Sequence, residues 1–302
     1  MEKKFLIDNN FSNTRLDKWF RLIVKDLPQS LIEKLLRKNI IKVNKKKVKS
    51  SYRLKEKDII EIYNIDKIKN KIKTSNFKYK ASKKERSNLS TLVLEDNENF
   101  IVINKPCGLP VQSGTKSPKN LIDILRNTKY FANQNPFIVH RIDKDTSGLL
   151  LIAKNRKFAQ LLTSLFRLRK IHKTYLAISI GNIDNSIKNL KDNLIYYENK
   201  KKYTQNAFTN IKILKNSDRY TLSELNPITG RKHQLRKQLF NIGNSIVGDS
   251  KYNIAKKKII NQRLMLHAYK IKFKINDIKY NFKAPYDNDF EEFVKKKYLD
   301  IF

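Results

Sequence analysis

The chain has 302 residues, of which 40% are hydrophobic and 10% aromatic, enough for one large domain or two smaller ones with apolar cores. Its 65 Lys and Arg against 28 Asp and Glu give a formal charge of +37, which attracts polyanions such as RNA or DNA. A single cysteine, Cys107, excludes an internal disulfide and a multi-cysteine zinc site.

Targeting and membrane segments are not expected. The first ten residues contain no apolar run long enough for a signal peptide, and no segment approaches the roughly 18 apolar residues of a membrane span. Together with the single cysteine, this predicts a cytoplasmic protein without a membrane partner. Nothing in the sequence demands more than a monomer.

Residues 13–62 are expected to form a small domain. Apolar side chains at helical spacing predict an amphipathic helix over residues 14–26, which Pro28 ends. A second set, Ile32, Leu35 and Leu36, predicts another helix with Asn39 as its left-handed C-cap. Short strands are expected from residue 41 onward, with a turn at residues 44–45 and a last strand at 59–62.

A basic cluster lies in this predicted hairpin, where residues 42–57 hold eight basic side chains and one acid. Arg-Leu-Asp-Lys at 15–18 and Ile-Lys-Val-Asn-Lys-Lys-Lys-Val at 41–48 resemble the S4 RNA-binding domain, although Lys57 stands where that domain has Gly before Asp58. The resemblance implies RNA contacts by the cluster, and the alternative is a solvated basic face. The candidate contacts are Lys45, Lys46, Lys47, Lys49 and Arg53.

Residues 63–90 are expected to be a basic linker, because nine basic residues and one acid fall between Lys67 and Arg86 and the apolar periodicity is weak. From residue 91 to 302 the sequence predicts an α+β domain with a mainly antiparallel mixed sheet. Strands are expected at 92–94, 100–103, 148–153, 174–180, 207–214, 220–225 and 268–273, and helices at 121–126 and 159–167.

Four segments of this larger domain could carry chemistry. They are Asn-Lys-Pro-Cys-Gly-Leu-Pro-Val at 104–111, His-Arg-Ile-Asp-Lys-Asp-Thr-Ser-Gly at 140–148, Lys-Thr-Tyr-Leu-Ala at 173–177 and Thr-Gly-Arg-Lys-His-Gln-Leu-Arg at 229–236. Taken singly, Asp143 could be half of a structural ion pair with Arg141 or Lys144, and Tyr175 could be a core residue. The four histidines lie apart, so no metal site is expected.

Together the four segments resemble the RluA family of RNA pseudouridine synthases. The resemblance implies that Asp143 is catalytic, that Arg141 fills the place of a flipped uridine, that Tyr175 packs on the target base and that Arg236 pairs with Asp143. It also implies an RNA contact by Lys105, and a role for Arg231 as an RNA phosphate contact or a structural contact. The sequence departs from the family pattern at three places, with Lys237-Gln238 after the last segment, Asn244-Ser245, and Asn253 in place of a glycine.

Pseudouridine formation is an isomerisation that needs no cofactor, and none is expected. The order of S4-like domain, linker and catalytic domain resembles the RluC and RluD branches, which implies 23S (large-subunit) rRNA as partner. A tRNA-modifying member of the family is the alternative. A non-catalytic ribosome-assembly factor would have lost Asp143, Tyr175 or Arg236, and a DNA-binding basic protein would ignore the 2′-hydroxyl.

Overall fold

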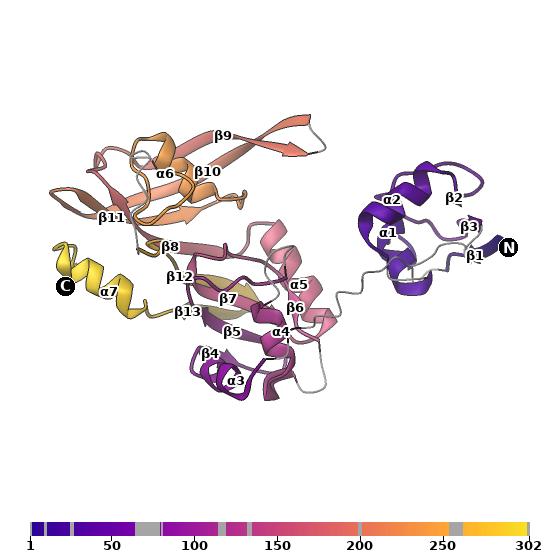
Figure 1. Cartoon of the computed structure of the whole chain (residues 1–302), viewed down its shortest axis with the longest axis horizontal. Coiled ribbons are helices and arrows are strands. Elements are labelled where there is room, and N and C mark those ends of the chain that lie inside the picture. The colour runs from indigo at the N-terminus through magenta and orange to yellow at the C-terminus, as the bar shows by residue number, and fades with distance from the viewer. Residues whose placement is uncertain are drawn as a thin grey trace. The chain divides into compact units, whose positions relative to one another are not determined.

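The computed structural model describes residues 2–8, 11–24, 27–63, 79, 81–113, 119–131, 135–198, 201–253 and 262–300. The chain divides into two compact units, Met1–Phe77 and Lys78–Phe302 (Figure 1). This division differs from the expected linker over 63–90, because helix α3 (Lys83–Ser90) belongs to the second unit. A capping box between Ser82 and Glu85 starts α3. Residues 64–78 and 80 of the expected linker lie outside the described residues.

The N-terminal unit has the predicted order of helices followed by a hairpin. Helix α1 (Leu16–Trp19) continues into a π-helical turn η2 (Phe20–Val24), and α2 (Gln29–Arg37) follows. Strands β1 (Glu2–Leu6), β2 (Ile41–Val43) and β3 (Ile59–Tyr63) form an antiparallel sheet in the order β1-β3-β2. Strand β1 was not expected.

Local turn chemistry in this unit follows the predictions. Asn39 has φ of 57°, as expected of a left-handed residue after α2. Asn44 and Lys45 have φ of 49° and 62°, which makes the tight turn after β2. The core beneath is built on Trp19 and Phe20, which are 2% and 0% exposed.

The described strands of the second unit form one ten-stranded sheet, mixed and mostly antiparallel as predicted (Figure 1). Its main path runs β4-β5-β7-β12-β8-β11-β10-β9, with β6 added to β7 and β13 to β12. The strands are β4 (Val93–Asp96), β5 (Phe100–Lys105), β6 (Phe137–Ile138), β7 (Ser147–Ala153), β8 (His172–Ile180), β9 (Asn189–Glu198), β10 (Lys201–Ser217), β11 (Tyr220–Pro227), β12 (Leu266–Ile275) and β13 (Ile278–Lys283).

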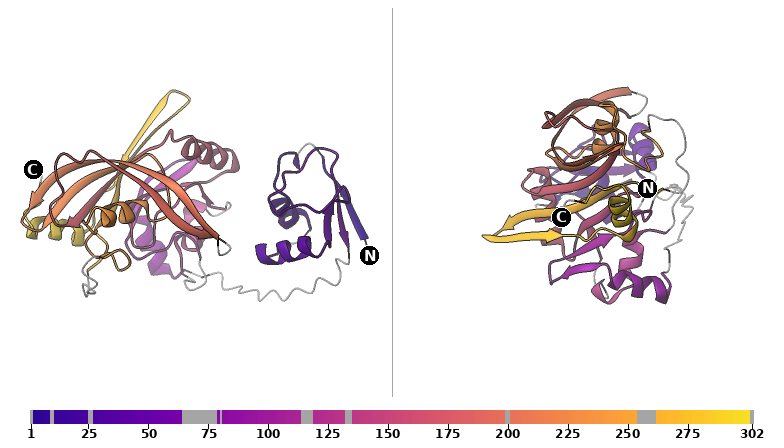
Figure 2. Two further views of the ribbon diagram at one scale, coloured as in Figure 1. Left: turned by 90° about the horizontal axis from the view of Figure 1, so that it is seen from above. Right: turned by 90° about the vertical axis from the view of Figure 1, so that its left-hand side faces the viewer.

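The remaining helices of this unit are α4 (Leu121–Arg126), the 3-10 turn η4 (Lys129–Phe131), α5 (Arg156–Arg167), α6 (Gln234–Asn241) and α7 (Asn288–Lys296). The β12–β13 hairpin projects beyond the rest of the sheet (Figure 2). Among the described residues, no helix combines the length and the apolar character needed to cross a membrane.

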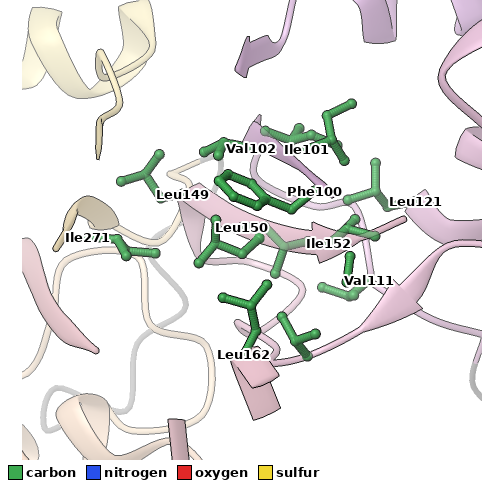
Figure 3. Close-up of a cluster of buried hydrophobic side chains, with 14 of the residues drawn as sticks. Phe100, Ile101, Val102, Val111, Leu121, Leu149, Leu150, Ile152, Leu162 and Ile271 are labelled. Carbon is green, nitrogen blue, oxygen red and sulfur yellow. The ribbon is translucent and has the colours of Figure 1, made fainter. Parts of the chain in front are cut away.

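Strand β7 is the buried centre on which the site is built. All seven of its residues are buried, and Leu149, Leu150 and Ile152 surround Phe100 of β5 (Figure 3). Burial of each such side chain contributes about 1.5–3 kcal/mol relative to exposure. At its first residues β7 pairs in parallel with β12, and a Cβ on Gly148 would overlap the Ala268 backbone. This close pairing fixes where the preceding loop, residues 139–146, enters the sheet.

Candidate active site

The loop that carries Asp143 is braced on one side by His140. The Nε2 atom of His140 accepts a hydrogen bond from the backbone N–H of Leu151 at 2.9 Å, and its ring stacks on Phe166 with centroids 4.3 Å apart. Burial lowers the pKa of His140 to about 3, so the ring stays neutral and keeps its acceptor role. A turn bond from Thr146 N–H to the Asp143 carbonyl, at 3.2 Å, closes the loop ahead of β7.

Lys105 braces the same loop from the other side. Its ammonium donates to the carbonyls of Pro106, Leu109 and Lys144 at 2.7, 2.9 and 2.9 Å. The residue is 0% exposed, and burial lowers its pKa to about 8. The expected RNA contact by Lys105 is therefore wrong, because its three donors are satisfied inside the protein. Cys107 adds a further tie, with its Sγ 2.9 Å from the Asp145 carbonyl.

The Asp143 carboxylate faces two groups at the start of α6, the N-cap residue His233 and Arg236 of the first turn. Arg236 Nη1 lies 3.6 Å from one carboxylate oxygen, and His233 Nε2 lies 3.8 Å from the other. The Asp143 side chain is 29% exposed, so one side of the carboxylate remains open. Among the described residues, the ion pair of Asp143 is made by Arg236, with the His233 imidazole beside it, and not by Arg141 or Lys144.

Arg236 makes its strongest contact with Asp249, a residue that the sequence analysis did not assign to the site. The guanidinium donates through Nε and Nη2 to the two Asp249 oxygens, both at 2.7 Å, and the Asp249 side chain is 0% exposed. Burial alone would raise the pKa of Asp249, but the hydrogen bonds from Arg236 and from the backbone N–H groups of Tyr252 and Lys251, together with the Arg236 charge, outweigh burial and the pKa is lowered. Asp249 therefore leaves Nη1 as the edge of Arg236 that points to Asp143.

Tyr252 connects His233, the second group that faces Asp143, to the segment that carries Asp249. Its hydroxyl lies 3.0 Å from His233 Nδ1, and its ring lies 5.3 Å from the Arg236 guanidinium carbon. The backbone N–H groups of Lys251 and Tyr252 donate to Asp249 at 2.8 and 2.9 Å. His233, the residue before α6, has φ of 54°, and this left-handed conformation is part of the geometry that presents its ring to Asp143. Residues 249–252 thus organise both partners of Asp143.

A cavity of about 820 Å³ opens over these groups. It brings together the predicted Arg141, Asp143, Tyr175, Arg231 and Arg236. Burial raises the pKa of Tyr175, which keeps its ring neutral and suited to stacking. The described lining residues include seven Lys and Arg but only one carboxylate, Asp143. This excess of positive charge favours a polyanionic substrate. A glycosidase would need a second carboxylate across the cleaved bond.

The candidate RNA contacts differ in their surroundings. Lys45, Lys46, Lys47, Lys49 and Arg53 belong to the N-terminal unit, and all five are exposed. Arg231 is partly buried, and its Nε donates to the Asn206 carbonyl at 3.3 Å. Within the residues that the structure describes, no group of three or more His, Cys, Asp or Glu is arranged to hold a metal ion.

Known proteins are similar to this chain over most of its length. The sequence matches the family described as RNA pseudouridylate synthase over residues 99–241. The chain is 31% identical to ribosomal large subunit pseudouridine synthase C of Vibrio parahaemolyticus, over 95% of this chain and 93% of that protein. The protein of the same name from Rickettsia felis is 36% identical, over 86% and 88% of the two chains.

A solved structure, human RNA pseudouridylate synthase domain containing 4, has a similar fold. The TM-score is 0.60 at 24% identity, and the match covers 70% of this chain and 95% of that one. The fold, the family match and the extent of the curated relatives lead to one conclusion. The chain belongs to the RluA family of RNA pseudouridine synthases, isomerases that convert uridine to pseudouridine in RNA.

Proposed function

We propose that this enzyme isomerises specific uridines of 23S (large-subunit) rRNA and that Asp143 is its catalytic residue. The observation that carries the proposal is the position of Asp143, the single carboxylate among the described residues of a strongly basic cavity. Its loop is braced by His140 and Lys105, and its carboxylate is flanked by Arg236 and His233. The choice of RNA is supported by the relatives named large subunit pseudouridine synthase C.

The reaction breaks the C1′–N1 bond of uridine, and the bonding electron pair leaves with N1 of the ring. After the ring turns, C5 forms the new bond to C1′, C5 loses its proton and N1 gains one. Asp143 either attacks C1′ or removes the C2′ proton, and both routes need an ionised carboxylate next to the sugar. Atoms and electrons balance without an oxidant or a donated group, so the chemistry needs no cofactor.

The target nucleotide must leave its stack before Asp143 can reach the sugar, which costs a few kcal/mol. We propose that Tyr175 offsets part of this cost by stacking on the ring, since base–aromatic stacking contributes about 1–3 kcal/mol. Arg141 lines the same cavity and would fill the position from which the uridine leaves. Arg231 would contact a phosphate at the edge of the cavity.

For the N-terminal unit we propose an S4-type RNA-binding role. Its helices, hairpin and exposed lysine cluster support the assignment. Exposed lysines contact phosphates and raise affinity without choosing the base. An enzyme that modifies rRNA would act in the cytoplasm, where that RNA is transcribed and assembled.

The test is a carbodiimide primer-extension map of pseudouridines in rRNA from cells that carry the gene, lack it, or carry Asp143→Asn. We expect discrete stops in large-subunit rRNA to vanish both without the gene and with Asp143→Asn. Purified Asp143→Asn should still bind an rRNA transcript, because the change removes a charge and little volume. Full product from Asp143→Asn would refute the catalytic assignment, and stops lost only from tRNA would move the substrate there.

A further inference from the structure

One basic side chain of the active-site cavity, Lys173, has no role in the fold or in the mechanism described above. Lys173 lies on β8, two residues before Tyr175, and both line the cavity over Asp143. Lys173 is partly buried, and burial lowers its pKa. Within the part of the chain that the structure describes, its ammonium has no hydrogen-bond acceptor and no carboxylate within reach. The free energy spent on desolvating this cation is therefore not recovered inside the protein.

The charged groups that the structure describes around Lys173 do not include a carboxylate that could pair with its ammonium. Arg169, a like charge, helps to lower the pKa of Lys173, and the Lys173 charge in turn helps to lower the pKa of His140. A Cβ at position 230 would lie 3.9 Å from Lys173 Nζ, so the ammonium lies close to Gly230, another residue of the cavity wall. A cation kept in this position is suited to a negatively charged or strongly polar group of the ligand.

The geometry of β8 indicates which part of the nucleotide would contact Lys173. Residues i and i+2 of a strand project from the same face, about 7 Å apart, so Lys173 stands beside Tyr175 in the place where the ring would stack. Arg167, Arg169 and Lys232 also line the cavity and are exposed, which suits them to hydrated phosphates. A partly desolvated ammonium beside the stacking position is better suited to the base.

We propose that Lys173 is a catalytic residue that binds a carbonyl oxygen of the flipped uracil and stabilises the negative charge of the ring after its bond to C1′ breaks. The electron pair of that bond leaves with N1 and is delocalised onto the ring carbonyls, by either route open to Asp143. Lys173 neither gives nor takes a proton, and the charge disappears when C5 bonds to C1′. The inference rests on the proposed active site and adds a second role within it.

The test uses the full chain and a full-length large-subunit rRNA transcript, and compares Lys173→Met, Lys173→Arg and the matched control Lys272→Met, an exposed lysine of β12 outside the cavity. We expect Lys173→Met to slow the single-turnover rate about 10²- to 10³-fold, the effect of removing one preorganised donor to a developing charge. The dissociation constant should change less than about threefold. Lys173→Arg should recover most of the rate, and Lys272→Met should match the native chain.

Two results would overturn the proposal. A weaker complex with an unchanged single-turnover rate and a shallower salt dependence would make Lys173 a phosphate contact. An unchanged rate and an unchanged affinity would show that the ammonium does not meet the substrate. Asp143→Asn, run in parallel, separates this inference from the proposed function. If Asp143→Asn kept its product while Lys173→Met lost it, the role of Asp143 would fail and that of Lys173 would stand.

Discussion

Replacement of Asp249 by Asn tests whether the buried pair with Arg236 organises the site. The change removes one charge from a bidentate pair with both distances at 2.7 Å and both side chains almost fully buried. Loss of one partner from such a pair costs about 3–5 kcal/mol, because the buried guanidinium loses its closest counter-charge and keeps only the more distant Asp143 carboxylate. The freed guanidinium would no longer hold Nη1 at 3.6 Å from Asp143, so we expect the catalytic rate to fall about 10- to 100-fold, as for other groups that orient functional ligands.

The assay is urea unfolding with two signals. The chain has one tryptophan, Trp19, which is 2% exposed in the N-terminal unit, so its fluorescence follows that unit alone. Circular dichroism is weighted towards the larger second unit. We expect Asp249→Asn to shift the dichroism transition and to leave the Trp19 transition in place. The double variant Arg236→Met with Asp249→Leu should regain stability but not activity.

Asp249 would have no role in organising the site if Asp249→Asn unfolded at the native urea concentration and kept the native rate. Arg236 would not be needed for catalysis if the apolar double variant were fully active. A loss of stability with an unchanged rate would restrict Asp249 to a structural role. The three outcomes differ in two measured quantities, so each can be recognised.

Two further predictions concern acid and salt. Burial lowers the pKa of His140 to about 3 and of His267 to about 4, so below pH 6.5 the unfolded chain binds more protons and stability is lost as pH falls. Between pH 7 and 5 the two rings should together remove about 4 kcal/mol, and His140→Gln should remove about half of that loss, as urea unfolding at both pH values would show. Changing Lys45, Lys46 and Lys47 to Gln should reduce the slope of log affinity for rRNA against log salt by about 2–3, measured by filter binding. The same change at Lys272, Lys274 and Lys279 is the charge-matched control; equal slopes for the two triple variants would contradict an RNA role for the hairpin.

Sequence patterns predicted that several segments far apart in the chain belong to one site, and the structure brings these segments together. The loop with Asp143, the strand with Tyr175 and the segment with Arg236 converge on one cavity, although they lie far apart in the chain. Helix 121–126 and the turn at Asn44 and Lys45 were also predicted, because capping and left-handed residues act locally.

The missed features depend on tertiary contacts. Lys105 resembled a surface cation, but its ammonium is buried under three carbonyls that come together only in the folded loop. Asp249 is one acid among many in the sequence, and its importance follows from the bidentate geometry with Arg236. Helix α3 has weak apolar periodicity, and Leu89 alone among its residues is buried, so composition indicated a linker instead.

The cations in and around the active site have different roles, which the amino-acid composition could not reveal. Arg236 is largely neutralised by Asp249, so it orients Asp143 more than it attracts RNA. The ammonium of Lys105 is also enclosed, and its donors support the loop rather than the substrate. Lys173 remains as the cation beside Tyr175 without a partner among the described residues. Because the protein satisfies the first two cations and leaves the third without an internal partner, we expect the departing base of the proposed reaction to be stabilised more by Lys173 than by the net charge of the chain.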